Sequence, residues 1–315
     1  MQDLNTSKEP SKALIIIAFA GLYIIWGSTY LAIRIAIAHI PPFFLVATRF
    51  LFAGTVLFSW CLYKGEKIPS FKTFCNIGLG GFLMLFLGNG AVSWAEQYIP
   101  SGLVAIIVAT VPLWFVLLDK SQWKYYFSNK IIVLGVLIGF AGVLMLFAGK
   151  GSIELSGDKM RVISFFVLIL GSIGWAAGSL YSKYKKVEGS VVMKAAVQML
   201  VAGIVAATAG LVTNEQARVD THTISAESVA ALAYLVVMGS LVGYMSYIWL
   251  LSVRPASIVG TYAYVNPVVA VFLGWLILDE AITSSQVIAL LVILAGVILV
   301  NAKKETKKIT TDERS

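Results

Sequence analysis

The chain has 315 residues, of which 24 are Lys or Arg and 16 are Asp or Glu, so its formal net charge is +8. Its residues are 59% hydrophobic and 13% charged, whereas a soluble domain has about 25% charged residues. These values exclude an ordinary soluble domain and predict a chain that lies in a lipid bilayer.

Long apolar runs predict ten membrane helices. A helix needs about 20 mostly apolar residues to cross the hydrocarbon core, and helices satisfy their own backbone hydrogen bonds in lipid. The expected spans are 13–34, 43–63, 73–98, 102–119, 131–148, 161–182, 190–212, 227–251, 256–278 and 285–302. The first apolar run is too long for a signal peptide and no clear cleavage site follows it, so we expect it to be retained.

One segment of the chain occurs twice. The stretch GNGAVSWAEQYIPSGLVAIIVATVP at 88–112 returns as GYMSYIWLLSVRPASIVGTYAYVNP at 243–267, with one Trp and two Pro at the same spacing. We therefore predict two copies of one unit, 12–150 and 160–304. The remaining ends, 1–11 and 305–315, are expected to be disordered tails. Since each copy holds five helices, the second copy should enter the membrane from the opposite side, as in the inverted repeats of transporters.

The positions of the basic residues predict the orientation. If the N-terminus is cytoplasmic, the inner segments hold 18 of the 24 Lys and Arg residues and the outer segments hold five. The positive-inside rule then places both ends of the chain in the cytoplasm. The basic charge is explained by topology and by anionic lipid headgroups, so we expect a lipid partner and no nucleic acid.

The sequence carries no catalytic or metal-binding pattern. Cys61 and Cys75 lie in or beside apolar runs without metal or disulfide spacing, and small apolar packing explains both. No H-E-x-x-H, G-x-S-x-G, Walker A or G-x-G-x-x-G motif occurs. We therefore expect neither an enzyme nor a cofactor, and no ATP-driven pump.

Four residues are candidates for coupling or gating. Pro112 and Pro267 lie deep in apolar runs, where each frees a backbone carbonyl that needs a partner or a wet cavity. Arg49 is the one charged residue in the interior of a predicted span, away from its ends, about 12 Å from the outer end. We expect Glu96 either to pair with Arg49 or to share a water-filled outer vestibule with it. In the alternative interpretation, Glu96 only marks the membrane surface and the two prolines are structural kinks.

Aromatic and polar residues at helical spacing predict a binding cavity. Small-molecule sites combine apolar and aromatic walls with a few polar groups. The same residues could instead pack between helices or form an interfacial belt. The candidate substrate-binding residues are Trp26, Tyr30, Asn89, Trp175, Tyr244, Tyr262 and Asn266.

Four segments resemble the EamA branch of the drug/metabolite transporter superfamily. This resemblance implies ten helices, a central cavity between two repeats, and export of amino acids or other small metabolites across a bacterial inner membrane. The sequence departs from the family pattern at 114–127, where no acidic pair follows the fourth helix as one does after the ninth. The matching segments are LYIIWGSTYLAIR at 22–34, PPFFLVATRFLFAG at 41–54, GNGAVSWAEQYIPSGLVAIIVATVPL at 88–113 and YAYVNPVVAVFLGWLILDEAIT at 262–283.

The sequence thus favours a secondary transporter that exports amino acids or related metabolites by alternating access. Its partners would be a small-molecule substrate, protons and membrane lipid, in a monomer or homodimer. An importer or exchanger of a vitamin, nucleoside or quaternary amine remains open. A channel would need a continuous polar pore, and a membrane-embedded enzyme or sensor would need a catalytic cluster or an effector domain, neither of which the sequence indicates.

Overall fold

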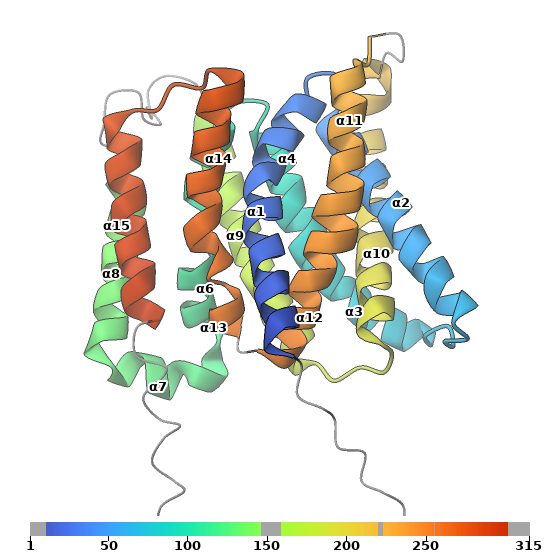
Figure 1. Ribbon diagram of the computed structural model, residues 1–315, viewed down its shortest axis with the longest axis horizontal. Coiled ribbons are helices and arrows are strands. Elements are labelled where there is room, and N and C mark those ends of the chain that lie inside the picture. The colour runs from blue at the N-terminus through green and yellow to red at the C-terminus, as the bar shows by residue number, and fades with distance from the viewer. Residues whose placement is uncertain (1–10, 146–158, 220–222, 255, 302–315) are drawn as a thin grey trace, which may run out of the picture.

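The computed structural model describes residues 11–145, 159–219, 223–254 and 256–301, which form a bundle of helices without a strand (Figure 1). Seven helical segments in these ranges are long and apolar enough to cross a membrane, or eight if a pair bent by 102° counts as one span. Two shorter apolar helices, Val265–Leu278 and Ser284–Val300, accompany them. The predicted all-α membrane class is confirmed, whereas the number of ten spans stays a prediction. Most of both predicted tails and the limits at 150 and 304 lie outside the described residues.

The first half of the chain contains two unbroken helices followed by segmented ones. The third expected span is divided by a π-helix, and the fourth by a turn at Ala109 and Thr110. A short helix that the sequence did not predict, α7, crosses one end of the bundle before α8 (Figure 1). The bounds are α1 Lys12–Ala36, α2 Pro42–Tyr63, α3 Phe71–Gly81, η1 Phe82–Asn89, α4 Gly90–Ala95, α5 Ser101–Val108, α6 Val111–Leu118, η2 Lys120–Gln122, α7 Trp123–Ser128 and α8 Lys130–Met145.

The second half follows the same plan. Its third segment again contains a π-helix, and a turn at Gly260 and Thr261 divides its fourth. The start of α1 and the end of α15 lie at the same end of the bundle (Figure 1). The bounds are α9 Lys159–Tyr184, α10 Val191–Val212, η3 Glu215–Arg218, α11 Ala226–Tyr234, η4 Leu235–Tyr244, α12 Met245–Val253, α13 Ala256–Val259, α14 Tyr262–Leu278 and α15 Ser284–Asn301.

Two glutamates, the buried Glu215 and the half-buried Glu280, accept hydrogen bonds from the first turns of distant helices. Glu280 accepts from the N–H groups of Ser101 (2.9 Å) and Gly102 (3.2 Å) at the start of α5, and from the Ser101 hydroxyl. Glu215 accepts from the N–H groups of Phe43 (3.0 Å) and Phe44 (3.1 Å) at the start of α2. Burial raises the pKa of Glu215, and these two N–H groups act in the opposite direction. Both carboxylates satisfy helix N–H groups that have no partner within the helix.

Glycines bring elements of the two halves into close contact. α2 packs against α10, and α8 against α15, at opposite edges of the view in Figure 1. A Cβ atom on Gly135 would lie 2.7 Å from the Gly296 carbonyl oxygen, and one on Gly142 would lie 2.9 Å from the Ile293 nitrogen. Only residues without a side chain allow this backbone approach. Helices of the two halves are therefore packed directly against each other.

The two π-helices occupy matched positions in the repeat. η1 ends at Asn89 and η4 ends at Tyr244, the residues that the 155-residue offset pairs. π-Helices are rare and frequently occur at functional sites. The apolar pattern predicts a helix at both places and gives no indication of the wider turn.

The prolines do not break the two helices in the same way. Pro112 lies in the first turn of α6, just after the Ala109–Thr110 turn, where a missing N–H costs nothing. Pro267 lies inside the continuous helix α14, and the break in this half comes earlier, at Gly260 and Thr261. The two prolines, at matched positions of the repeat, therefore lie at different places in their helices.

Candidate functional site

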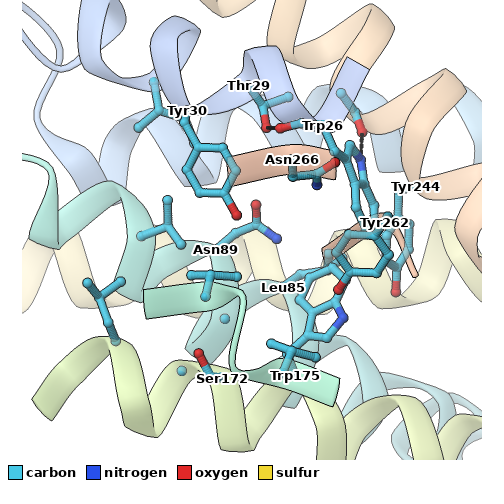
Figure 2. Close-up of a pocket in the computed structure, with 18 of the residues that line it drawn as sticks. Trp26, Thr29, Tyr30, Leu85, Asn89, Ser172, Trp175, Tyr244, Tyr262 and Asn266 are labelled. Atoms are coloured by element: carbon cyan, nitrogen blue, oxygen red, sulfur yellow. Dashed lines mark hydrogen bonds between the residues drawn. The ribbon is translucent and has the colours of Figure 1, made fainter. Parts of the chain in front are cut away.

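A cavity lies at the centre of the bundle, between elements of both halves (Figure 2). Its volume is about 60 Å³, which is room for a few water molecules and too little for a metabolite. All seven predicted substrate-binding residues line it, together with Arg49, whereas Pro112 and Pro267 do not. The lining residues are Trp26, Thr29, Tyr30, Ile33, Arg49, Phe50, Leu85, Gly88, Asn89, Val92, Val108, Val111, Leu168, Gly171, Ser172, Trp175, Gly239, Tyr244, Tyr262 and Asn266.

Aromatic rings form one side of the cavity. Trp26 on α1 is at the centre of this wall, with ring-centre distances of 5.3 Å to Trp175, 5.1 Å to Tyr262 and 5.1 Å to Tyr247. The first two pairs meet edge to face, a favoured geometry for aromatic rings. Gly243 makes room for this packing, because a Cβ atom there would lie 2.9 Å from Cδ1 of Trp26.

Polar atoms of three aromatic residues of the cavity are paired within the protein. Nε1 of Trp26 donates to the Gly239 carbonyl oxygen (3.2 Å), and Nε1 of Trp175 donates to the Tyr247 hydroxyl (3.2 Å). The Tyr244 hydroxyl donates to Oε1 of Gln198 (2.8 Å). These bonds hold the rings in place, and rings in fixed orientations give the wall a defined shape.

Other polar groups face the cavity without a partner in the described part of the chain. The Ser172 hydroxyl is buried and makes no hydrogen bond, and no hydrogen bond to the Tyr30 hydroxyl or the Asn89 amide is formed there either. Figure 2 shows Tyr30 and Asn89 pointing into the same space from α1 and η1. The amide nitrogen of Asn266 instead donates to the carbonyl oxygens of Tyr23 and Tyr262 (3.1 Å each). The cavity can therefore offer hydrogen bonds to a ligand.

Arg49 is 4% exposed and reaches from α2 toward η4. Its Nε donates to the Ser240 hydroxyl at 2.8 Å, and its guanidinium carbon lies 4.9 Å from the centre of the Phe50 ring. The predicted ion pair with Glu96 is not formed between the described side chains, because Arg49 contacts η4 and Glu96 lies beyond the end of α4.

Glu96 is fully buried within the bundle, while its depth relative to the membrane surface stays a prediction. Its backbone oxygen accepts a hydrogen bond from Nη1 of Arg34. Neither carboxylate oxygen has a hydrogen-bond partner among the described residues, although Arg34 and Glu280 interact with it electrostatically. A buried carboxyl group without a partner is costly to keep ionised.

Two larger hollows lie at opposite ends of the bundle, on either side of the central cavity. One has a volume of about 500 Å³ and includes Lys183, Lys194 and Gln198. The other has about 480 Å³ and includes Arg34 and Glu280. Gln198 contacts the first hollow and bonds to Tyr244 of the cavity, so this pair separates the two spaces.

Sequence reasoning missed several residues of the site. Tyr247 and Ser172 lie three positions from Tyr244 and Trp175, so helical spacing could have indicated both. Gln198 is the repeat counterpart of Arg49, because this part of the two copies matches at an offset of 149 residues, which also pairs Trp26 with Trp175. Glu280 contacts residues 179 positions away, which no local pattern reveals. Among the described residues, no group of three or more His, Cys, Asp or Glu side chains is placed to hold a metal ion.

Comparisons with known proteins agree with this architecture. The model of the EamA-like transporter family matches the chain twice, at 13–148 and 162–302. "Uncharacterized inner membrane transporter YedA" from Escherichia coli (strain K12) is 38% identical over 288 residues, which cover 91% of this chain and 90% of the relative. "Uncharacterized transporter YvbV" from Bacillus subtilis (strain 168) is 24% identical over 303 residues and 96% of each protein.

A solved structure described as "Crystal structure of protein" has the same fold, with a TM-score of 0.64 at 18% identity over 92% of this chain and 98% of the other. The resemblance noted in the sequence is confirmed by the double match of one family model and by the 38% identity to a relative along most of both chains. The chain therefore belongs to the EamA-like transporter family.

Proposed function

We propose that this membrane transporter is a secondary exporter of amino acids or related small metabolites in a bacterial inner membrane. The observation that carries the proposal is the small central cavity that both halves line and that lies between two larger hollows. A transporter that alternates between two open states passes through a closed one of this kind. A ligand would enlarge the cavity by moving the side chains that now fill it.

The direction of transport rests on the orientation of the chain. The hollow next to Gln198 contains Lys183, Lys185, Lys186 and Lys194, and the positive-inside rule assigns that end to the cytoplasm. An exporter takes up its substrate from this hollow. At the opposite end of the bundle, Glu280 holds the start of α5 by accepting hydrogen bonds from its first N–H groups. Both termini would then be cytoplasmic, in agreement with the start of α1 and the end of α15, which lie at the same end of the bundle (Figure 1).

Metabolite profiling followed by reconstitution tests the proposal. Cells that overproduce the protein should accumulate the substrate in the medium, and purified protein in liposomes should release the same compound from the lumen. A Trp26→Ala variant, which removes the centre of the aromatic wall, should lower the release at least tenfold. Liposomes that move none of the amino acids or metabolites found by profiling, in either direction, would contradict the proposal.

Protons are the proposed driving ion, with Glu96 as their binding site. Glu96→Gln should still move substrate down its gradient but should lose its response to a pH gradient, because glutamine resembles the protonated side chain and cannot release a proton. Efflux from liposomes with and without a pH gradient measures this. Glu188→Gln, which changes an exposed loop residue, is the matched control and should behave as the unchanged protein. An unaltered response to pH in Glu96→Gln would exclude Glu96 from this role.

A further inference from the structure

The central cavity contains a guanidinium group for which the described residues provide no counter-ion. Arg49 is buried, and no acidic side chain of the described part interacts with it. Arginine remains protonated in proteins, and an unpaired charge inside a membrane protein is costly and is usually found at a functional site. The few waters that the cavity can hold would hydrate the group in the empty protein. The missing partner is therefore an anion that comes with the ligand.

The geometry of Arg49 is suited to a carboxylate. Its Nε is used by Ser240, while neither Nη atom has a hydrogen-bond partner in the described residues, so the end of the guanidinium is free for a bidentate contact. Gly239 leaves the necessary room, because a Cβ atom there would lie 2.8 Å from Nη2. The single positive charge of Arg49 neutralises one carboxylate in this small cavity, but it does not neutralise a doubly charged phosphate.

The other residues that line the cavity indicate the chemistry of the rest of the ligand. The wall around Trp26, Trp175 and Tyr262 is aromatic and can pack against an apolar or aromatic body. The unpaired Ser172 hydroxyl can serve one further polar group. A quaternary amine is disfavoured, since it would lie in the same small space as the Arg49 cation.

The lysines of the hollow next to Gln198 also favour an anionic ligand. Lys185, Lys186 and Lys194 line this hollow, and a cluster of one sign raises the local concentration of ligands of the opposite sign. The hollow meets the cavity at the hydrogen bond between Gln198 and Tyr244. An anionic ligand would thus be attracted to the side from which an exporter loads.

We propose that the substrate carries a carboxylate and an apolar or aromatic body, and that Arg49 binds this carboxylate in the central cavity. The inference rests on the transporter function proposed above and defines its substrate class. It predicts that the protein discriminates between a carboxylic acid and the matching neutral amide.

Binding to the purified full-length protein in detergent tests this without a transport assay. The probes are matched pairs: phenylacetate with phenylacetamide, phenylalanine with phenylalaninamide, and leucine with leucinamide. Ligand binding is followed by the fluorescence of the cavity tryptophans and by thermal stabilisation. Some acids should bind the unchanged protein about 10- to 100-fold more tightly than their amides, because hydrogen bonds to a charged group are strong.

Three variants connect the preference to Arg49. Arg49→Gln carries the residue found at the matched position 198 and should abolish the preference for the acid. Arg49→Lys keeps the charge but loses the fork and should retain only part of it. Gly239→Ala displaces the guanidinium without removing its charge and should weaken acid binding while the protein stays folded. Gel filtration checks folding, and if Arg49→Gln does not fold, Arg49→Lys and Gly239→Ala carry the comparison.

Equal affinity for acids and amides, binding of no acid at all, or an unchanged preference in the folded variants would overturn the inference. Failure of the transporter proposal is recognised separately. Acid binding that depends on Arg49 without any movement of the acid through liposomes would contradict transport alone. Transport of a neutral or cationic compound that does not depend on Arg49 would contradict the substrate class alone.

Discussion

Gly81→Ala is expected to lower the free energy of unfolding by about 3 kcal/mol or to prevent folding, the largest effect of any single methyl group at the α3–α10 contact. A Cβ atom on Gly81 would lie 2.5 Å from Cα and 2.7 Å from the carbonyl carbon of Gln198. These are backbone atoms of α10, so no side-chain rotation relieves the clash. The same shift would displace Gln198 from its hydrogen bond with Tyr244.

The backbone of Gly81 is not itself a reason for glycine. Its φ of −63° and ψ of −44° are ordinary helical values, and alanine favours a helix by about 1 kcal/mol over glycine. Gly21→Ala is the matched control, because a Cβ atom there would meet only Cδ1 of Ile25 at 3.8 Å. Thermal unfolding in detergent should show a large loss for Gly81→Ala and no loss for Gly21→Ala. Equal midpoints would show that the α3–α10 contact can relax.

Glu280→Ala should destabilise the protein by about 2–3 kcal/mol. The substitution removes a half-buried carboxylate from the Ser101 and Gly102 N–H groups and from the Ser101 hydroxyl. These donors would be left unpaired at the positive end of α5. Because α5 and α6 contribute Val108 and Val111 to the cavity, transport should fall as well.

Two further variants separate the charge of Glu280 from its shape. Glu280→Gln keeps one acceptor oxygen and should lose about half as much stability as Glu280→Ala. Asp279→Asn neutralises the adjacent carboxylate. The backbone of residue 279 is in the left-handed conformation (φ of 52°) at the end of α14, and asparagine tolerates that conformation. It should therefore have little effect. A Glu280→Ala protein that unfolds at the wild-type temperature would show that water replaces the carboxylate.

The sequence predicted much of the fold because apolar runs and turn residues are local signals. The expected end of the second helix at 63 and of the seventh at 212 agree with Tyr63 and Val212. The turns at Ala109–Thr110 and Gly260–Thr261 and the π-helices could not be predicted, because a slightly wider or interrupted turn leaves the apolar pattern unchanged. Tertiary packing decides them.

The site was partly predictable for a similar reason. Trp26, Asn89 and Asn266 were recognised because polar and aromatic groups are unusual in an apolar run, and the structure places them around one cavity. The pairing of Arg49 with Glu96 was inferred from depth in the membrane alone. Depth does not specify the direction of a side chain around its helix, and Arg49 points toward Ser240 instead.

The matched π-helices also carry historical information. A π-turn is one residue wider than an α-turn, as if a single residue had been inserted into a regular helix. Both halves contain this irregularity, and it ends at Asn89 in one and at Tyr244 in the other. The simplest history is one insertion in an ancestral gene that encoded a single unit, followed by duplication and fusion. Such an ancestor would have carried one residue type at the two positions where Asn89 and Tyr244 now line the cavity from different halves of the chain.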